Sequence, residues 1–354
     1  MSKTRPLRVL IVAPSQGRYG GLEAFVLALA ESLRTAPEFS PRLCFKLVQG
    51  AEFSGELRAR CEKLGVDFTV VTRASHTLFQ QLRWADVVHA QNPSPDVALG
   101  AHLAGRPLVM TIINHRSASH TLHTRLWSVA VRLAHERCYI SDFVRSTWEP
   151  KGLRRHSQVL PAVSSLPPAG EINWNRAGFF FVGRWIANKG LEELLEAYAT
   201  AKIDLARWPL TLAGDGPLRT RVEEIIAQHQ LATVRRAGFI SDEEKFSLMA
   251  RAKWNVAPPH TREDLGLTPI EARHFAVPSI ITRDGGLPEA AGPQALVAEP
   301  GDVASLRARL EEAAAMPEEE YRRRALASQA ELSKFLRPLS DYHRLYQKLA
   351  WWCA

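Results

Sequence analysis

The sequence predicts an α/β protein built from two parallel, doubly wound sheets. Short apolar runs alternate with amphipathic helical segments along the whole chain. The first run, Leu7–Ala13, is followed after Gly20-Gly21 by apolar residues at helical spacing. The length of 354 residues exceeds what one compact core usually covers. We therefore expect two domains, each with a sheet covered on both faces.

The predicted elements follow each other in a regular order. Strands in the first half are expected at Leu7–Ala13, Arg42–Val48, Phe68–Val71, Asp86–Ala90, Leu108–Ile113 and Arg137–Ile140. Strands in the second half are expected at Gly178–Val182, Leu210–Ala213, Val234–Ala237, Asn255–Ala257 and Ser279–Thr282. Helical segments lie between them, and one of these, Ser241–Ala250, has Ser241 as a predicted N-cap.

A proline-rich stretch separates the halves. The segment PAVSSLPPAGEINWN, which begins at Pro161, has no helical period and is typical of a linker. We assign residues 1–165 to an N-terminal domain and residues 171–337 to a C-terminal domain. A last helix, at about 338–354, is rich in aromatic residues and is expected to pack back on the first domain. Ligands are expected at the carboxyl ends of the strands.

Positive charge is concentrated in the first half. Residues 1–170 carry 21 Lys and Arg against 12 Asp and Glu, whereas the whole chain has a net charge of +8. Such a surface suits an anionic partner, namely nucleic acid, a phosphate-bearing acceptor or an anionic membrane face, and a generally basic protein is the equal alternative. The four cysteines lack paired spacing, which favours a reducing cytoplasm. No apolar window approaches the ~20 residues of a membrane span.

A loop in the second half is suited to a diphosphate. Gly183-Arg184 ends an apolar strand, and Lys189-Gly190 begins the next helix. Two cations beside the free N–H groups of a helix N-terminus can bind two phosphates. An ordinary basic surface loop is the alternative, because exposed Lys and Arg are common.

The next two strands also end in glycine-containing turns. Gly214 and Gly216 flank an aspartate after one strand, and glycine lets a backbone approach a ligand closely. Phe239 and Ile240 follow a glycine at the end of the other strand. Backbone groups at these ends are suited to contact a flat base, although turns alone would explain the same residues.

Two carboxylates bracket the segment E-D-L-G-L-T-P-I-E, from Glu263 to Glu271. Thr268 is a predicted N-cap, with Glu271 completing a capping box. Glu263 has no such local role. A carboxylate accepts hydrogen bonds from two vicinal hydroxyls at once, so the pair could hold the two sugars of a sugar nucleotide, with the Gly266 and Leu267 amides facing its diphosphate.

Together these motifs resemble the donor domain of retaining glycosyltransferases of family 4, which have the GT-B fold, two Rossmann-like domains facing across a cleft. The resemblance covers essentially the whole second half and also includes Gly285-Gly286-Leu287-Pro288-Glu289. In the first half, Gly20-Gly21-Leu22-Glu23 is similar to the family's GG-x-E loop after the first strand, and Asp86–Ala90 is similar to its D-V-V-H strand. Pro161-Ala162 replaces the family's usual Asn-Gly at the domain junction.

The resemblance implies roles for the matched residues. Arg184 and Lys189 would neutralise the donor diphosphate, and Glu271 would hold the ribose. Glu263 would hold the donor sugar. The remaining residues implied to line the donor site are Gly20, Gly21, Gly183, Gly214, Gly216, Phe239, Ile240, Gly266, Leu267 and Thr268. His115 is the expected counterpart of the family's sugar-site histidine, although it stands two residues late, and a surface or acceptor-loop histidine is the alternative.

The resemblance further implies metal-independent hexosyl transfer without a cofactor, with a UDP- or GDP-sugar as co-substrate. The expected acceptor is a glycan or a lipid-linked glycan of polysaccharide biosynthesis, such as a lipopolysaccharide core. We expect a cytoplasmic protein in peripheral contact with an anionic membrane, and no nucleic acid as a partner. A GT-B-fold epimerase or hydrolase of sugar nucleotides and a non-catalytic anion-binding module stay open as alternatives.

Overall fold

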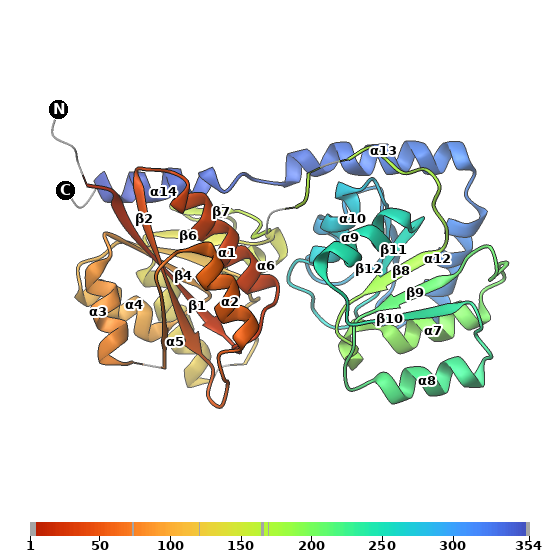
Figure 1. The fold of residues 1–354 in the computed structure, drawn as a ribbon, viewed down its shortest axis with the longest axis horizontal. Coiled ribbons are helices and arrows are strands. Elements are labelled where there is room, and N and C mark those ends of the chain that lie inside the picture. The colour runs from red at the N-terminus through yellow and green to blue at the C-terminus, as the bar shows by residue number, and fades with distance from the viewer. Residues whose placement is uncertain (1–4, 73, 120, 164–165, 169, 352–354) are drawn as a thin grey trace. The chain divides into compact units, whose positions relative to one another are not determined.

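The computed structural model describes residues 5–72, 74–119, 121–163, 166–168 and 170–351. They form two compact units. Unit 1 combines the described parts of Met1–Ser165 and Arg337–Ala354, and unit 2 is Leu166–Leu336. Each unit contains one parallel sheet with helices on both faces (Figure 1). The predicted α/β architecture is therefore confirmed.

Unit 1 has a seven-stranded sheet in the order β3-β2-β1-β4-β5-β6-β7, with all neighbours parallel. The strands are β1 (Leu7–Ser15), β2 (Phe39–Leu47), β3 (Phe68–Val71), β4 (Val87–Gln91), β5 (Leu108–Ile112), β6 (Glu136–Tyr139) and β7 (Ser157–Val159). The helices are α1 (Gly21–Arg34), α2 (Gly55–Leu64), α3 (His76–Trp84), α4 (Pro95–Leu103), α5 (Leu122–Leu133), α6 (Asp142–Trp148) and α14 (Ser340–Trp351). The sequence analysis did not predict β7, which is only three residues long.

Helix α14 packs into the core of unit 1 around a buried histidine. His89 of β4 lies with Nδ1 2.7 Å from Tyr346 Oη and Nε2 2.8 Å from Thr111 Oγ1 of β5. Thr111 Oγ1 is also 3.2 Å from Tyr342 Oη. These groups satisfy one another, which offsets the cost of burying them. Burial lowers the pKa of His89 to about 3.

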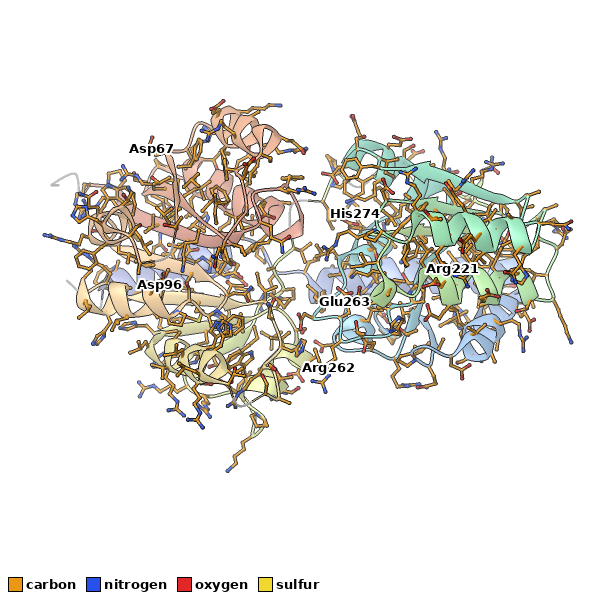
Figure 2. The ribbon with its side chains drawn as sticks, turned by 90° about the horizontal axis from the view of Figure 1, so that it is seen from below. Asp67, Asp96, Arg221, Arg262, Glu263 and His274 are labelled. Atoms are coloured by element: carbon orange, nitrogen blue, oxygen red, sulfur yellow. The ribbon has the colours of Figure 1, made fainter. Side chains whose placement is uncertain are left out.

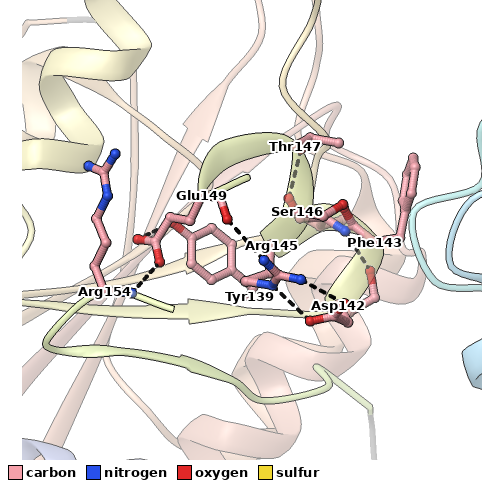
Figure 3. A network of polar contacts seen from close by, with 10 residues as sticks. Tyr139, Asp142, Phe143, Arg145, Ser146, Thr147, Glu149 and Arg154 are labelled. Atoms are coloured by element: carbon pink, nitrogen blue, oxygen red, sulfur yellow. Dashed lines mark hydrogen bonds and ion pairs between the residues drawn. The ribbon is translucent and has the colours of Figure 1, made fainter. Parts of the chain in front are cut away.

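A second buried polar cluster orders the segment after β6 (Figure 3). Glu149 Oε1 accepts hydrogen bonds from Tyr139 Oη at 3.0 Å and Ser157 Oγ at 2.8 Å. Its other oxygen accepts from the Arg154 amide at 2.8 Å. Arg145 donates to the Glu149 carbonyl at 2.9 Å, which closes the end of α6. The carboxylate thus ties α6 to both β6 and β7.

Unit 2 has a six-stranded parallel sheet in the order β10-β9-β8-β11-β12-β13. Its strands are β8 (Phe179–Val182), β9 (Leu210–Ala213), β10 (Val234–Gly238), β11 (Trp254–Ala257), β12 (Ser279–Thr282) and β13 (Leu296–Ala298). Its helices are α7 (Leu191–Thr200), α8 (Arg219–Gln228), α9 (Asp242–Arg251), α10 (Leu267–His274), α11 (Leu287–Ala291), α12 (Val303–Ala315) and α13 (Glu318–Phe335), with a 3₁₀ turn, η1, at Ala187–Lys189. Among the described helices of both units, none is long and apolar enough to cross a membrane.

Both sheets reverse their strand order beside the first strand. In unit 1 β1 lies between β2 and β4, and in unit 2 β8 lies between β9 and β11. The connections that leave the two central strands run in opposite directions, which opens a crevice at their carboxyl ends. In unit 2 the loops after β8 and β11 border this crevice.

We expect His89 to make unit 1 less stable in mild acid. Its folded-state pKa, about 3, lies below the ordinary 6.5, so the stabilisation is present above pH 6.5 and is lost as the pH falls towards 3. Well below pH 6.5 the loss from this group approaches about 1.4 kcal/mol per pH unit. Urea unfolding between pH 7 and about 5, above the range in which most carboxylates titrate, measures it.

His89→Gln is the matched variant, because an amide also donates and accepts hydrogen bonds but does not titrate in this range. Its unfolding free energy should depend less steeply on pH over the same interval. An identical slope in both proteins would contradict the assignment of the acid sensitivity to His89.

Candidate active site

The centre of the site is an ion pair at the switch point of unit 2. Lys189 lies in η1 after β8, and Glu263 lies next to Arg262 in the loop between β11 and α10 (Figure 2). Lys189 Nζ donates to Glu263 Oε2 at 2.5 Å. The side chains are 26% and 24% exposed, so solvent and ligands can reach both. The structure thus brings two predicted site residues into contact.

The turn that carries Lys189 packs its backbone against the loop after β11. Gly190 has φ +68°, and a Cβ on it would lie 1.8 Å from the Pro258 carbonyl oxygen. The His260 amide donates to the Asn188 carbonyl at 3.2 Å. Only glycine permits both this φ and this approach. Gly190 therefore sets how close Lys189 lies to the Glu263 loop.

A third loop, after β12, braces the backbone of Glu263. The Glu263 amide donates to Asp284 Oδ2 at 2.7 Å, and its carbonyl accepts from the Gly286 amide at 2.7 Å. A Cβ on Gly285 would lie 2.0 Å from the Glu263 carbonyl oxygen. The glycine pair, noted in the sequence only as a matching motif, thus holds Glu263 in place. The role of Asp284 was not predicted; its position directly before the two glycines was the available signal.

Glu271 is buried in α10, at 8% exposure, and pairs with a lysine that the sequence analysis did not predict. Lys245 Nζ of α9 donates to Glu271 Oε1 at 2.8 Å. Burial raises the pKa of Glu271, and the Lys245 ammonium opposes that shift. The carboxylate is therefore fixed in direction by a charge from the neighbouring helix.

The predicted capping box at the start of α10 is wrong. The helix begins at Leu267, and its N-cap is Gly266, which has no side chain with which to cap it. Thr268 and Glu271 are consequently its second and fifth residues. The reason is the φ of +89° at Gly266, which turns the chain into the helix earlier than a threonine cap would. The Leu267 amide and its neighbours thus form the free N-terminus.

Glycines also bring the ends of β8 and β9 together. A Cβ on Gly214, whose φ is +115°, would lie 1.9 Å from the Gly183 carbonyl oxygen. A Cβ on Gly216 would lie 2.5 Å from the Trp185 carbonyl oxygen. These positions cannot carry a side chain without moving the backbone. The loops after β8 and β9 therefore form one packed layer.

Three predicted residues of unit 2 are exposed or only partly buried. Phe239, just after β10, is 87% exposed, and Ile240 packs partly against an apolar cluster. Arg184 is exposed, and within the described ranges no side chain pairs with its guanidinium. The described residues also contain no group of three or more His, Cys, Asp or Glu that could hold a metal ion.

The predicted residues of unit 1 lie at the carboxyl edge of its own sheet. Gly20 is the N-cap of α1 and Gly21 its first residue, both after β1. His115 follows β5. The loop before α1 is fixed by Ser15 Oγ, which donates to Glu23 Oε1 at 2.8 Å. A buried carboxylate thus orders the glycine loop.

Comparison with protein families and curated proteins gives local matches. Residues 166–331 match the family model described as "Glycosyl transferases group 1". O-antigen chain mannosyltransferase C of Escherichia coli is 36% identical over 103 residues, which cover 29% of this chain and 26% of that protein. The uncharacterized glycosyltransferase YqgM of Bacillus subtilis is 25% identical over 229 residues, which cover 61% and 63%. The chain thus spans less than two thirds of the length of these curated relatives.

Solved structures match over nearly the whole chain. HepE of Anabaena, in complex with UDP, has a TM-score of 0.79 at 18% identity. The match covers 97% of this chain and 100% of HepE. The lipopolysaccharide outer core galactosyltransferase WaaB, in its apo form, has a TM-score of 0.69 at 14% identity, with coverage of 97% and 98%. At such identities the likeness shows the fold, and the GT-B assignment from the sequence is confirmed.

Gly285→Ala should destabilise unit 2, because the added methyl collides with the Glu263 carbonyl and the φ of +51° is strained for alanine. We expect a loss of about 1–3 kcal/mol in unfolding free energy, measured by urea denaturation. Gly55→Ala is the control, since nothing lies within 4 Å of its added methyl. A Gly285→Ala protein as stable as the Gly55→Ala protein would contradict the bracing role.

Proposed function

We propose that this chain, whose residues 166–331 match the family model of glycosyl transferases group 1, transfers a hexose from a nucleoside diphosphate sugar to a glycan acceptor, with retention of configuration. The observation that carries the proposal is the Lys189–Glu263 pair at the switch point of unit 2, with its 2.5 Å contact. A sugar diphosphate needs both a cation for its phosphates and an acceptor for its hydroxyls. The pair offers both in one accessible place.

In the proposed mechanism the cations stabilise the leaving group. Lys189 and the unpaired, exposed Arg184 neutralise the diphosphate as its bond to the anomeric carbon breaks. The free amides at the start of α10, from Leu267 onwards, add the positive end of a helix. No step of this scheme needs a bound metal. The acceptor hydroxyl attacks the anomeric carbon from the leaving-group face, through an oxocarbenium-like state, and its proton passes to the departing diphosphate. Configuration is thereby retained.

The two carboxylates are proposed to divide the sugars between them. Glu263 accepts hydrogen bonds from the transferred sugar, and its braced backbone limits how far it can move. Glu271, held by Lys245, accepts from the ribose hydroxyls. A carboxylate that is already held in position loses little conformational freedom when a ligand binds. Gly266, the N-cap of α10, and Thr268, in its first turn, lie between the two carboxylates along the chain.

UDP and GDP are the proposed donor carriers. HepE is solved with UDP, whereas the O-antigen relatives are named mannosyltransferases. Phe239 and Ile240 lie beyond β10, at the end of the layer formed by Gly183, Gly214 and Gly216, and we place the base beside them. Thermal unfolding with a panel of nucleoside diphosphates tests this, because a ligand that binds only the folded state raises its melting temperature.

Unit 1 is proposed to bind the acceptor, a glycan or lipid-linked glycan of polysaccharide biosynthesis at the cytoplasmic face of a membrane. Its basic charge suits a phosphate-bearing carrier. The names of the relatives, O-antigen mannosyltransferases and a lipopolysaccharide galactosyltransferase, support the same class. Gly20, Gly21 and His115 are the proposed contacts of unit 1 with the bound substrates.

Glu263→Ala and Lys189→Ala should each lower turnover by at least about 100-fold, because each removes charge that stabilises the transition state. Glu299→Ala is the control, since the Glu299 side chain lies outside the site and pairs with exposed Arg283. Product analysis with and without acceptor accompanies the rates. Near-normal turnover in both site variants would overturn the site, and rapid epimerisation or hydrolysis of donor alone would overturn the transferase assignment.

Lys245→Met should raise the pH below which the affinity for the nucleotide falls. Glu271 must be ionised to accept from two hydroxyls, and burial already raises its pKa above the ordinary 4.5. Without the ammonium the pKa rises further, so the affinity begins to fall at a higher pH. Lys202→Met, at an exposed lysine, is the control. Equal pH profiles for Lys245→Met and the control, measured by calorimetry, would show that Lys245 does not position an ionised Glu271.

A further inference from the structure

One face of unit 1 displays large apolar side chains. Helices α3, α4 and α5 follow one another over this face of the sheet (Figure 1). Among the described residues, six exposed large hydrophobics belong to these helices, and we call them the α3–α5 patch: Phe79, Leu99, Leu103, Leu122, Leu126 and Val129. Exposed apolar groups that gather on one face mark an interaction surface more often than single ones do.

Two helices of the patch, α4 and α5, expose leucines and bury mainly smaller apolar residues, whereas α3 buries Leu78 and Leu82 and exposes Phe79. On α5, Leu122, Leu126 and Val129 recur at helical spacing and face outward, whereas the residues that the helix buries are Ala130 and Val131. On α4 the buried residues are one valine, two alanines and a glycine, while Leu99 and Leu103 are 52% and 69% exposed. A helix that only had to cover a sheet would bury its leucines. The apolar residues that face outward are therefore suited to contact an apolar environment outside the protein.

The charges around the patch have one sign. The three helices contain Arg83, Arg125 and Arg132, and their single acid, Asp96 (Figure 2), is neutralised by Lys46 at 2.5 Å. In the part of the chain that the structure describes, no side chain pairs with the guanidinium of Arg125 or Arg132. Aliphatic residues with arginines at their border match an anionic bilayer, in which side chains enter the acyl boundary and guanidinium groups meet phosphates.

We infer that the α3–α5 patch binds the surface of an anionic lipid bilayer. Leu122 begins α5 at the carboxyl edge of the unit 1 sheet, the edge at which His115 follows β5. A lipid-linked acceptor could then reach this edge while its lipid stays in the membrane. The inference deepens the acceptor class of the proposed function, but lipid binding itself depends only on the patch.

The test is flotation of the full chain with phosphatidylglycerol-containing vesicles and with phosphatidylcholine vesicles. Leu122→Ser combined with Leu126→Ser should weaken partitioning to the anionic vesicles at least about tenfold, because two large apolar groups no longer enter the lipid. Leu153→Ser, which changes an exposed leucine of unit 1 outside the patch, should bind as the unchanged protein does. Arg125→Gln with Arg132→Gln should remove most of the preference for anionic vesicles.

Three outcomes would overturn the inference: no binding to either vesicle, equal binding by the leucine variant and the Leu153→Ser control, or a leucine variant that loses only self-association in sedimentation. The last result would mean that a second copy covers the patch. Nucleoside diphosphate binding is measured on the same proteins. Its absence alongside intact vesicle binding would count against the proposed donor site and leave the lipid surface standing.

Discussion

Contact between backbones is the constraint on which the site of unit 2 depends. Gly190 lies against the Pro258 carbonyl, Gly285 against the Glu263 carbonyl and Gly214 against the Gly183 carbonyl, each too close for any side chain. Because four loops from neighbouring strand ends converge in this way, an ammonium and a carboxylate meet without help from long flexible segments. Main-chain packing between the loops fixes the positions of the backbone, and these positions determine where the side chains of the site lie.

The two ion pairs of unit 2 have different physical characters. Lys189–Glu263 is partly exposed, so water screens it, it contributes little to stability and a ligand can separate it. Lys245–Glu271 is more buried, and breaking it would leave a charge without compensation in a poorly solvated place. The first pair is thus suited to exchange partners during a reaction. The second is suited to keep one carboxylate in a constant position.

The sequence was informative where backbone geometry leaves a local trace. Alternating apolar runs predicted the parallel sheets, and glycines after strand ends predicted close backbone approach, which the structure shows between neighbouring loops. Lys245 left no trace, because it is one lysine in a charged helix and its partner is 26 positions away. The cap of α10 was mispredicted because a positive φ at Gly266 prevailed over the side-chain preference of Thr268. Short strands such as β7 carry too few residues for a period to be recognised.

The docking of α14 has a consequence for how the protein is made. Tyr342 and Tyr346 complete the polar cluster around His89, yet they are synthesised after all of unit 2. A nascent unit 1 therefore lacks part of its core while the ribosome is still producing unit 2, whose own chain is continuous. Unit 1 therefore cannot complete its core until all of unit 2 has been synthesised, although most of unit 1 is made first.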